Sequence, residues 1–152
     1  MAKRIAFTEE RCTNCNLCLM YCSLAFGEKG IYDFRPSRAR IKVAVSTDDT
    51  KYVAHVCLQC VEPACVEACP EGALVKDPKT GVVTVNDDIC TGCAKCVKAC
   101  EYGCIFLFNK VAVKCEVCYD PLCVRACARG ALTLIDDDDV DEQANLYREV
   151  RI

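Results

Sequence analysis

The stretch RCTNCNLCLMYC, residues 11–22, holds four cysteines separated by two, two and three residues. The same gaps recur in CTGCAKCVKAC, residues 90–100. A second pattern, with gaps of two, four and three, occurs in CLQCVEPACVEACPEGAL, residues 57–74, and in CEVCYDPLCVRACARGAL, residues 115–132. These two segments align without a gap at an offset of 58 residues, which indicates an internal duplication.

The cysteine content narrows the classes of protein that this sequence fits. The chain has 152 residues, of which 17 are Cys, and such a content is typical of disulfide-stapled secreted domains or of metal proteins. The start, MAKRIAFTEERC, has neither the apolar region of a signal peptide nor a small-residue cleavage site. The odd cysteine count also argues against a disulfide framework. No apolar run approaches the ~20 residues of a membrane helix, so we expect a soluble chain without direct membrane insertion.

Four groups of four account for sixteen cysteines and leave only Cys104. A loop with three Cys at gaps of two presents three thiolates to three corners of a cubane cluster, and the fourth Cys reaches the other cluster of a pair. Zinc is the alternative, but zinc sites usually pair two short knuckles across a longer loop and often include His. The single His, His55, is interpreted as a strand residue and not as a ligand.

These groups resemble those of bacterial two-cluster ferredoxins, and their fourfold arrangement resembles the four-cluster electron-transfer subunits of molybdenum and tungsten oxidoreductases. The resemblance covers nearly the whole chain and implies four [4Fe-4S] clusters. The gap of four residues is a departure, and Pro63 or Pro121 stiffens the enlarged loop. A proline commonly follows the fourth Cys, but here only Pro70 does so, and the other three places hold Ser23, Glu101 and Ala128.

The resemblance also implies how the groups pair, because in that family the first group pairs with the last and the two middle groups pair together. The single hairpin of about twenty residues between Cys69 and Cys90 favours the same pairing of the middle groups. The outer pair gives two ligand sets, Cys12, Cys15, Cys18 with Cys127, and Cys115, Cys118, Cys123 with Cys22. The inner pair gives two more, Cys57, Cys60, Cys65 with Cys100, and Cys90, Cys93, Cys96 with Cys69. We expect Cys104 to be a buried small residue and not a ligand.

The segments between the cysteine loops predict an α+β fold of two nested modules, each similar to a bacterial two-cluster ferredoxin. The outer module is assigned to residues 1–34 and 110–152, a connecting hairpin segment to 35–51, and the inserted module to 52–109. Turn residues at 77–81 and 109–110 predict two hairpins, residues 39–45 and 52–56 a third, and residues 4–7 and 131–135 a pair of terminal strands. Short helices should begin near the third Cys of each group and end soon after the fourth. The clusters would serve as the core of this small chain and couple metal binding to folding.

The charge of the chain favours an anionic electron carrier. The formal net charge is −3, and four clusters at about −2 each would bring it to roughly −11, which favours docking on a basic surface. The tail DDDDVDE, residues 136–142, is either simply solvated or a docking element. The segment RPSRARIK, residues 35–42, is interpreted as an exposed face of the third hairpin. The acidic balance argues against nucleic-acid binding.

The resemblance implies an electron-transfer subunit that is not itself an enzyme. It would carry electrons between a large catalytic metal-pterin subunit and a flavin-linked, NAD-linked or ferredoxin partner. The length and the complete ligand set look most like the small iron–sulfur subunit of cytoplasmic tungsten aldehyde oxidoreductases. Equivalent subunits of formate dehydrogenase, hydrogenase and carbon monoxide dehydrogenase systems share the spacings.

Two other classes of function remain as alternatives. A diffusible polyferredoxin would need the same four clusters and no fixed partner. An iron–sulfur enzyme with substrate at an open iron would need a group with only three Cys, whereas all four groups here are complete. The sequence leaves open the catalytic partner, the cluster potentials and the oligomeric state, including self-association.

Overall fold

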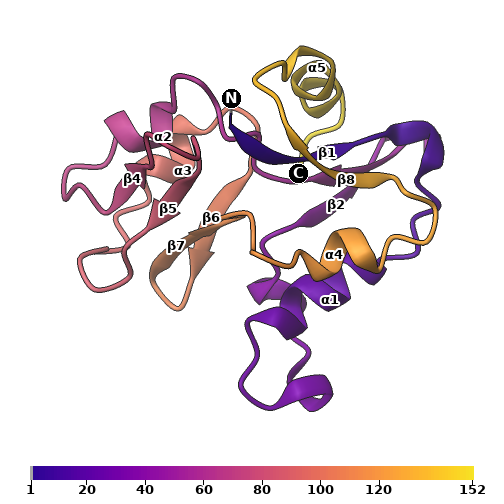
Figure 1. Ribbon diagram of the computed structural model, residues 1–152, viewed down its shortest axis with the longest axis horizontal. Coiled ribbons are helices and arrows are strands. Elements are labelled where there is room, and N and C mark those ends of the chain that lie inside the picture. The colour runs from indigo at the N-terminus through magenta and orange to yellow at the C-terminus, as the bar shows by residue number, and fades with distance from the viewer. Residues whose placement is uncertain (1) are drawn as a thin grey trace.

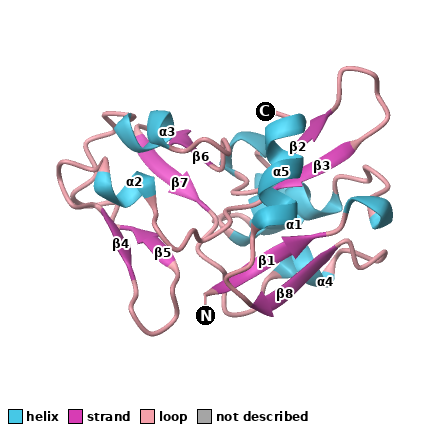
Figure 2. Ribbon diagram, turned by 90° about the horizontal axis from the view of Figure 1, so that it is seen from above, coloured by secondary structure: helices cyan, strands magenta, loops and turns pink. Residues whose placement is uncertain are grey.

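The computed structural model describes residues 2–152, which form short helices and four separate two-stranded antiparallel sheets (Figures 1 and 2). Each sheet is small because the cysteine loops interrupt the chain every few residues. Among the described residues, no helix has the length and apolar character that crossing a membrane requires. The mixed α+β class predicted from the sequence is confirmed.

The two ends of the chain form one sheet. Strand β1 (Lys3–Phe7) pairs antiparallel with β8 (Leu132–Asp136), and Ile5 lies opposite Leu134 in the register. Ile5 and Leu132 are buried, which places one face of the sheet on the core. The pairing of terminal strands expected from the sequence is therefore confirmed, and Figure 1 shows β1 and β8 side by side.

The other three sheets are the predicted hairpins. They are β2 (Lys42–Val45) with β3 (Tyr52–His55), β4 (Leu74–Lys76) with β5 (Val83–Val85), and β6 (Ile105–Phe108) with β7 (Val111–Lys114). The β6–β7 turn has Asn109 and Lys110 at φ of 51° and 63°. Positive φ at both central residues is the conformation that matches the twist of a two-residue hairpin.

Each cysteine group carries one short helix. These are α1 (Leu17–Ala25), α2 (Ala64–Glu67), α3 (Lys95–Ala99) and α4 (Leu122–Arg125), and all begin within one residue of the third Cys, as predicted. The predicted ends are right only for α1, which continues past Cys22. The other three helices stop before the fourth Cys, because the chain turns there toward a glycine with positive φ.

The acidic tail is part of the fold through its backbone, whereas most of its acidic side chains are solvent-exposed, as the solvated interpretation predicts. Arg4 of β1 donates hydrogen bonds to the carbonyl oxygens of Asp137 (3.3 Å) and Asp139, and Asp138 accepts one from the Ala2 N–H (2.7 Å). The last two acidic residues of the tail open a helix that the sequence analysis missed, α5 (Asp141–Glu149). Acidic side chains in a first turn are favourable there because of the helix dipole.

The elements group into two lobes (Figures 1 and 2). We call residues 2–56 and 115–152 the terminal lobe, which holds β1, β2, β3, β8, α1, α4 and α5. Three single-turn 3-10 helices, Glu9–Arg11, Gly30–Asp33 and Pro36–Arg38, also belong to it. Residues 57–114 form the central lobe, which holds α2, α3 and the sheets β4–β5 and β6–β7.

Each lobe has its own cluster of buried side chains. The larger cluster lies mostly in the terminal lobe, around Ile5, Val53 and Tyr147, and the smaller one is confined to the central lobe. The module boundaries drawn from the sequence stay a prediction. The boundary between residues 51 and 52 falls inside the β2–β3 sheet, whose Ala44 and Val53 both belong to the larger cluster.

Candidate metal centres

The four cysteine loops share one backbone feature. The residue before the second Cys has a left-handed conformation in every group, at Asn14 (φ 54°), Gln59 (54°), Gly92 (69°) and Val117 (50°). Alternation of right- and left-handed residues turns backbone N–H groups toward one point and makes a concave anion site. Gly92 is the most constrained of the four, because a Cβ there would lie 2.2 Å from the Lys110 carbonyl oxygen.

The first cysteine group shares a cavity with Cys127, which is the fourth Cys of the last group. One apolar cavity of the terminal lobe is lined by Cys12, Cys15, Cys18 and Cys127. Burial raises the pKa of Cys18 to about 11, and the charges of the other three thiolates add to this effect. The Cys18 thiol therefore resists deprotonation in the absence of a cation, so metal binding to it must displace a proton.

The two middle groups exchange their fourth cysteines in the central lobe. One cavity is lined by Cys57, Cys60, Cys65 and Cys100, with Cys104 beside them. A second is lined by Cys69, Cys90, Cys93 and Cys96. Helices α2 and α3 pack against each other between these cavities.

The remaining four thiols lie where α1 packs on α4 in the terminal lobe. Burial raises the pKa of Cys123 to about 12, and the nearby charges of Cys22 and Cys118 raise it further. Cys115 is buried, and its electrostatic neighbours include both Cys123 and Cys57. This set therefore borders the first set on one side and a central-lobe set on the other.

The fourth cysteines receive backbone hydrogen bonds. The N–H of Ala73 lies 3.3 Å from Cys69 Sγ, and that of Ala131 lies 3.2 Å from Cys127 Sγ. Both contacts follow a glycine with positive φ, Gly72 or Gly130. Such bonds stabilise a thiolate. The repeated Gly-Ala-Leu is the sequence signal for this turn, although its spacing alone does not show which sulfur the N–H meets.

Cys104 occupies the position that Ala73 and Ala131 occupy in the other groups, four residues after a fourth Cys. It is 5% exposed, and its Sγ lies 3.5 Å from the Val56 carbonyl oxygen and 3.4 Å from that of Tyr102. The expected burial is confirmed. Hydrogen bonds from the Cys104 side chain and then from neighbouring backbone N–H groups lower the pKa of Cys100 to about 6.

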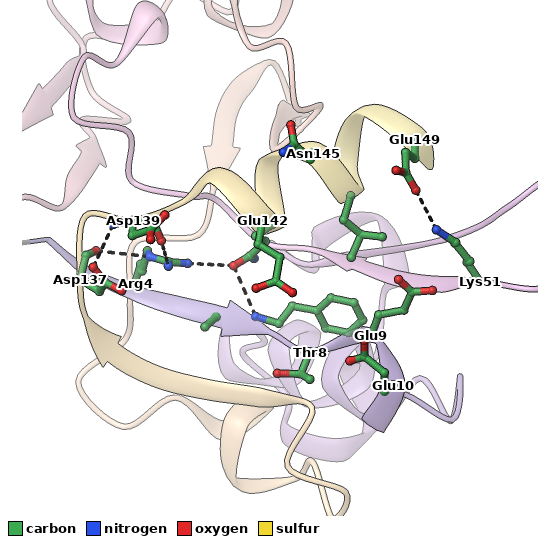
Figure 3. A pocket seen from close by; sticks show the side chains of 14 residues that line it. Arg4, Thr8, Glu9, Glu10, Lys51, Asp137, Asp139, Glu142, Asn145 and Glu149 are labelled. Atoms are coloured by element: carbon green, nitrogen blue, oxygen red, sulfur yellow. Dashed lines mark hydrogen bonds and ion pairs between the residues drawn. The ribbon is translucent and has the colours of Figure 1, made fainter.

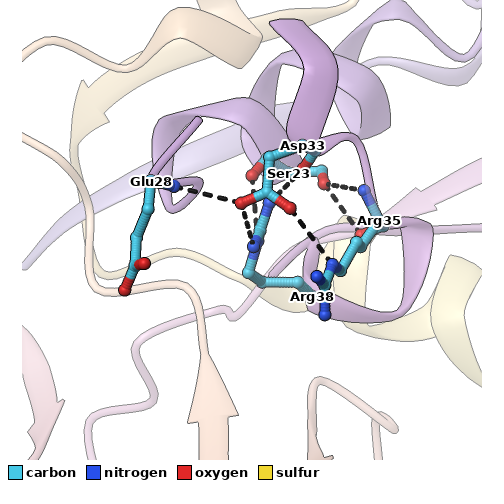
Figure 4. A network of polar contacts seen from close by, with 5 residues as sticks. All are labelled: Ser23, Glu28, Asp33, Arg35 and Arg38. Atoms are coloured by element: carbon cyan, nitrogen blue, oxygen red, sulfur yellow. Dashed lines mark hydrogen bonds and ion pairs between the residues drawn. The ribbon is translucent and has the colours of Figure 1, made fainter. Parts of the chain in front are cut away.

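Cys22 is held differently, through the segment that follows α1. Figure 4 shows the polar contacts that order this segment. Ser23 stands where a proline is common, and its hydroxyl donates to the Arg35 carbonyl and accepts from the Arg35 N–H, both at 2.8 Å. Asp33 accepts from Arg38 Nη1 at 3.0 Å and from the Glu28 N–H at 3.1 Å. The ordered segment brings the Arg40 N–H to 3.2 Å from Cys22 Sγ.

The same segment corrects the interpretation of residues 35–42 as an exposed face of a hairpin. Only Lys42 lies in a strand, and Arg38 is 12% exposed because it pairs with Asp33. The Arg40 guanidinium pairs with Glu116 at 2.8 Å and covers the Phe26 ring at 3.9 Å. Arg38 and Arg40 thus form ion pairs within the protein, and these pairs hold the loop beside Cys22.

His55 is the strand residue that the sequence predicted. It ends β3, is buried, stacks on the Tyr147 ring at 4.1 Å, and has carbonyl oxygens at 3.1 and 2.6 Å from its two ring nitrogens. In the part of the chain that the structure describes, no three His, Cys, Asp or Glu side chains converge as ligands of a single ion. The cysteines instead surround cavities.

A further cavity, of about 510 Å³, contains no cysteine (Figure 3). It lies between β1, the first 3-10 helix and α5, and most of its charged side chains are acidic. They are Glu9, Glu10, Asp137, Asp139, Glu142 and Glu149, with Arg4 and Lys51 as the basic ones. Lys51 pairs with Glu149 at 2.7 Å across its mouth.

Comparison with protein families identifies the chain. A family model described as a 4Fe-4S dicluster domain matches residues 48–137, and a 4Fe-4S binding domain matches residues 9–29. The chain belongs to the 4Fe-4S dicluster family. The cysteine sets fit the clusters of this family, because they offer thiolates around apolar cavities with backbone N–H groups directed at sulfur.

Relatives of this 4Fe-4S protein come from several organisms. It is 34% identical over 157 residues to a ferredoxin of Methanocaldococcus jannaschii, covering 99% of this chain and 86% of the relative. It is 38% identical over 126 residues to the polyferredoxin-like subunit of an aliphatic sulfonate oxidoreductase of Pyrococcus furiosus, covering 81% and 70%. It is 36% identical over 149 residues to the beta subunit of NADH-dependent phenylglyoxylate dehydrogenase of Aromatoleum evansii, covering 96% of this chain but only 32% of that subunit.

A solved structure shares the fold of this 4Fe-4S protein. A chain of the active site complex BamBC of benzoyl-coenzyme A reductase superposes with a TM-score of 0.52, covering 95% of this chain and 86% of that chain. The identity is 19%, so the likeness describes the fold alone.

Proposed function

We propose that the chain is a non-catalytic electron-transfer protein that carries four [4Fe-4S] clusters. The observation that supports this most directly is the sharing of fourth cysteines, since each cavity collects three thiols from one group and one from another. The proposed ligand sets are Cys12, Cys15, Cys18, Cys127; Cys22, Cys115, Cys118, Cys123; Cys57, Cys60, Cys65, Cys100; and Cys69, Cys90, Cys93, Cys96.

The proposed sets follow one another in a line. Cys18 neighbours Cys123, and Cys115 neighbours Cys57, while α2 and α3 join the two central-lobe sets. When bound, each cluster supplies a site that gains or loses one electron. The chain places these sets next to one another and excludes water from the sulfurs with side chains such as Leu17, Val43 and Leu132.

We further propose a large catalytic metal-pterin oxidoreductase as the partner, with a tungsten aldehyde oxidoreductase as the specific candidate. Two relatives support a place in an oxidoreductase complex, since their names describe subunits of a dehydrogenase and of an oxidoreductase. A diffusible polyferredoxin is the second candidate, and it is favoured by the ferredoxin relative, 86% of which this chain covers. The predicted cytoplasmic location stays a prediction.

Anaerobic purification of the chain tests the cofactor proposal. We expect about sixteen iron atoms per chain and a broad brown absorbance that dithionite bleaches. Cys127→Ser should disturb the cluster of the first group, and Cys22→Ser that of the fourth group, as seen by electron paramagnetic resonance. Colourless protein with stoichiometric zinc, or about eight iron atoms in the unsubstituted chain, would contradict the four-cluster assignment.

Metal analysis of the native complex tests the partner. The tagged chain should co-purify from its source cells with a large chain that contains tungsten or molybdenum in a fixed ratio to iron. A chain that elutes alone with its full iron content, and exchanges electrons with several soluble enzymes, would identify the diffusible carrier instead.

A further inference from the structure

Lys114 is a buried lysine at the junction of the two lobes. It is the last residue of β7 and is only 1% exposed. Its Nζ donates to the carbonyl oxygens of Val83 and Cys115, the second at 2.8 Å, and to Gln59 Oε1 at 3.4 Å. Three oxygen acceptors match the three N–H groups of an ammonium.

The charge of this ammonium is not balanced by a carboxylate. Among residues 2–152, none of the ion pairs involves Lys114. The acidic side chain next to it in sequence, Glu116, points elsewhere, since its Oε2 pairs with Arg40 at 2.8 Å and its Oε1 accepts from the Val85 N–H at 2.9 Å. A buried charge without a counter-charge is costly, so the site requires an anion that the side chains do not supply.

Two of the cysteine sets lie on either side of this ammonium. Its acceptor Cys115 belongs to one set, and its acceptor Gln59 lies between Cys57 and Cys60 of another. The positive charge of Lys114 lies near enough to both Cys65 and Cys115 to act on each of them electrostatically. The same charge therefore acts on both of the sets proposed for the middle of the line.

We propose that Lys114 is the internal counter-ion of the two middle clusters and raises the reduction potentials of both. The inference rests on the proposed function, because it assumes clusters bound at these two sets. Each cluster becomes more negative by one charge when it gains an electron, and a nearby ammonium stabilises that form. Because the middle sets are the more buried ones, this charge offsets the penalty that burial places on their reduction.

Redox titration of substituted, anaerobically purified protein tests the proposal. The neutral variants are Lys114→Met and Lys114→Gln, and Lys114→Arg keeps the charge. Lys76→Gln is the matched control, because Lys76 also donates to a ligand carbonyl, Cys60 O at 2.9 Å, but is partly solvent-exposed. Solvent screening should make the effect of the control smaller.

We expect the neutral variants to lower the reduced-to-oxidised ratio of two clusters about tenfold at a given solution potential, a shift of about 59 mV for one electron. The other two clusters should not shift, and Lys114→Arg should restore the original values. Iron is quantified in parallel. Fewer than about sixteen iron atoms in the unsubstituted chain would contradict the four-cluster assignment and not the role of Lys114.

Three results would overturn the proposal. They are unchanged potentials in iron-replete Lys114→Gln protein, an equal shift of all four clusters, and loss of iron from the arginine variant as well as from the neutral ones. If the neutral variants fail to retain iron while Lys114→Arg retains it, the requirement for a positive charge is supported directly.

Discussion

The two lobes use the same two cysteine patterns but contain very different amounts of ordinary protein core. The buried cluster of the central lobe is small and consists of Ala73, Leu74, Val83, Cys96, Ile105 and Ala112. Both lobes hold two small sheets, but the terminal lobe adds helix α5, and its cluster is about three times as large. The comparison shows how far a fold can rely on its cofactor when the side chains alone bury little apolar surface.

Tyr147 is the clearest example of the larger protein core of the terminal lobe. It lies on α5, is 1% exposed, and its hydroxyl donates to the Ala54 carbonyl and accepts from the Val56 N–H, both at 2.9 Å. Gln143 connects the same hydroxyl to Arg4 and β1. The central lobe also has buried polar contacts, since Lys114 of β7 and Gln59 both bond to Val83 of β5, but among its described residues no helix outside the cysteine groups packs on its hairpins. Its hairpins therefore depend more on the cysteine loops beside them.

Iron removal should produce the largest difference in stability between the two lobes. After anaerobic chelation, we expect the backbone amides of β4, β5, β6 and β7 to lose all protection from hydrogen exchange. Those of α5, β2 and β3 should keep measurable protection, because their packing does not depend on thiol ligation alone. Mass spectrometry of exchanged peptides measures both, and equal loss of protection in the two lobes would refute the contrast.

A matched pair of alanine substitutions should have the second-largest effect. Gly92→Ala places a Cβ against the Lys110 carbonyl and should remove about four of the expected sixteen iron atoms. Asn14→Ala changes the equivalent residue of the first group, which also has positive φ, and should cost only about 1–2 kcal/mol of left-handed strain. Iron analysis with chemical denaturation distinguishes them, and full iron content in Gly92→Ala would show that the loop can move.

Removal of one hydroxyl should have a smaller effect on the terminal lobe. Tyr147→Phe leaves the buried Val56 N–H without its acceptor and should lower the free energy of unfolding by about 1–3 kcal/mol at full iron content. Tyr119→Phe is the control, because Tyr119 is fully exposed beside Cys118. Denaturant titration of both iron-loaded variants checks this, and equal stability would mean that the Tyr147 hydroxyl does not stabilise the terminal lobe.

Cys104→Ala should have the smallest effect. The protein already has alanine at the two equivalent positions, Ala73 and Ala131, and their N–H groups meet sulfur in the same way. We expect unchanged iron content and a loss of stability of about 1 kcal/mol at most. Cys100→Ala should remove one cluster, and a loss of about four iron atoms in the Cys104 variant would mean that the two residues exchange roles.

The sequence predicted local features well because short spacings determine them. The turn at Asn109 and the helix starts beside each third Cys follow from neighbouring residues alone. The use of Arg38 and Arg40 inside the fold could not be predicted, because their partners Asp33 and Glu116 are brought to them by tertiary packing. Helix α5 was missed because its start lies within a run of aspartates that resembles a solvated tail.

Lys114 illustrates the same limit at the candidate site. In the segment VAVK it looks like the polar end of a β-strand, and nothing local shows that its acceptors come from Gln59 and Val83, far earlier in the chain. The cysteine spacings identified the kind of cofactor, whereas the charge placed between the sets became visible only in three dimensions.

The β1–β8 pairing has a consequence for synthesis on the ribosome. Lys3 leaves the exit tunnel long before its strand partner Asp136, which follows the whole central lobe in the sequence. Strand β1 therefore has no partner strand while the whole central lobe is synthesised and has time to fold. Strand β1 is made before the central lobe but is paired only after it, so a chain truncated before β8 would carry an unprotected strand edge beside its finished middle, a template for aggregation.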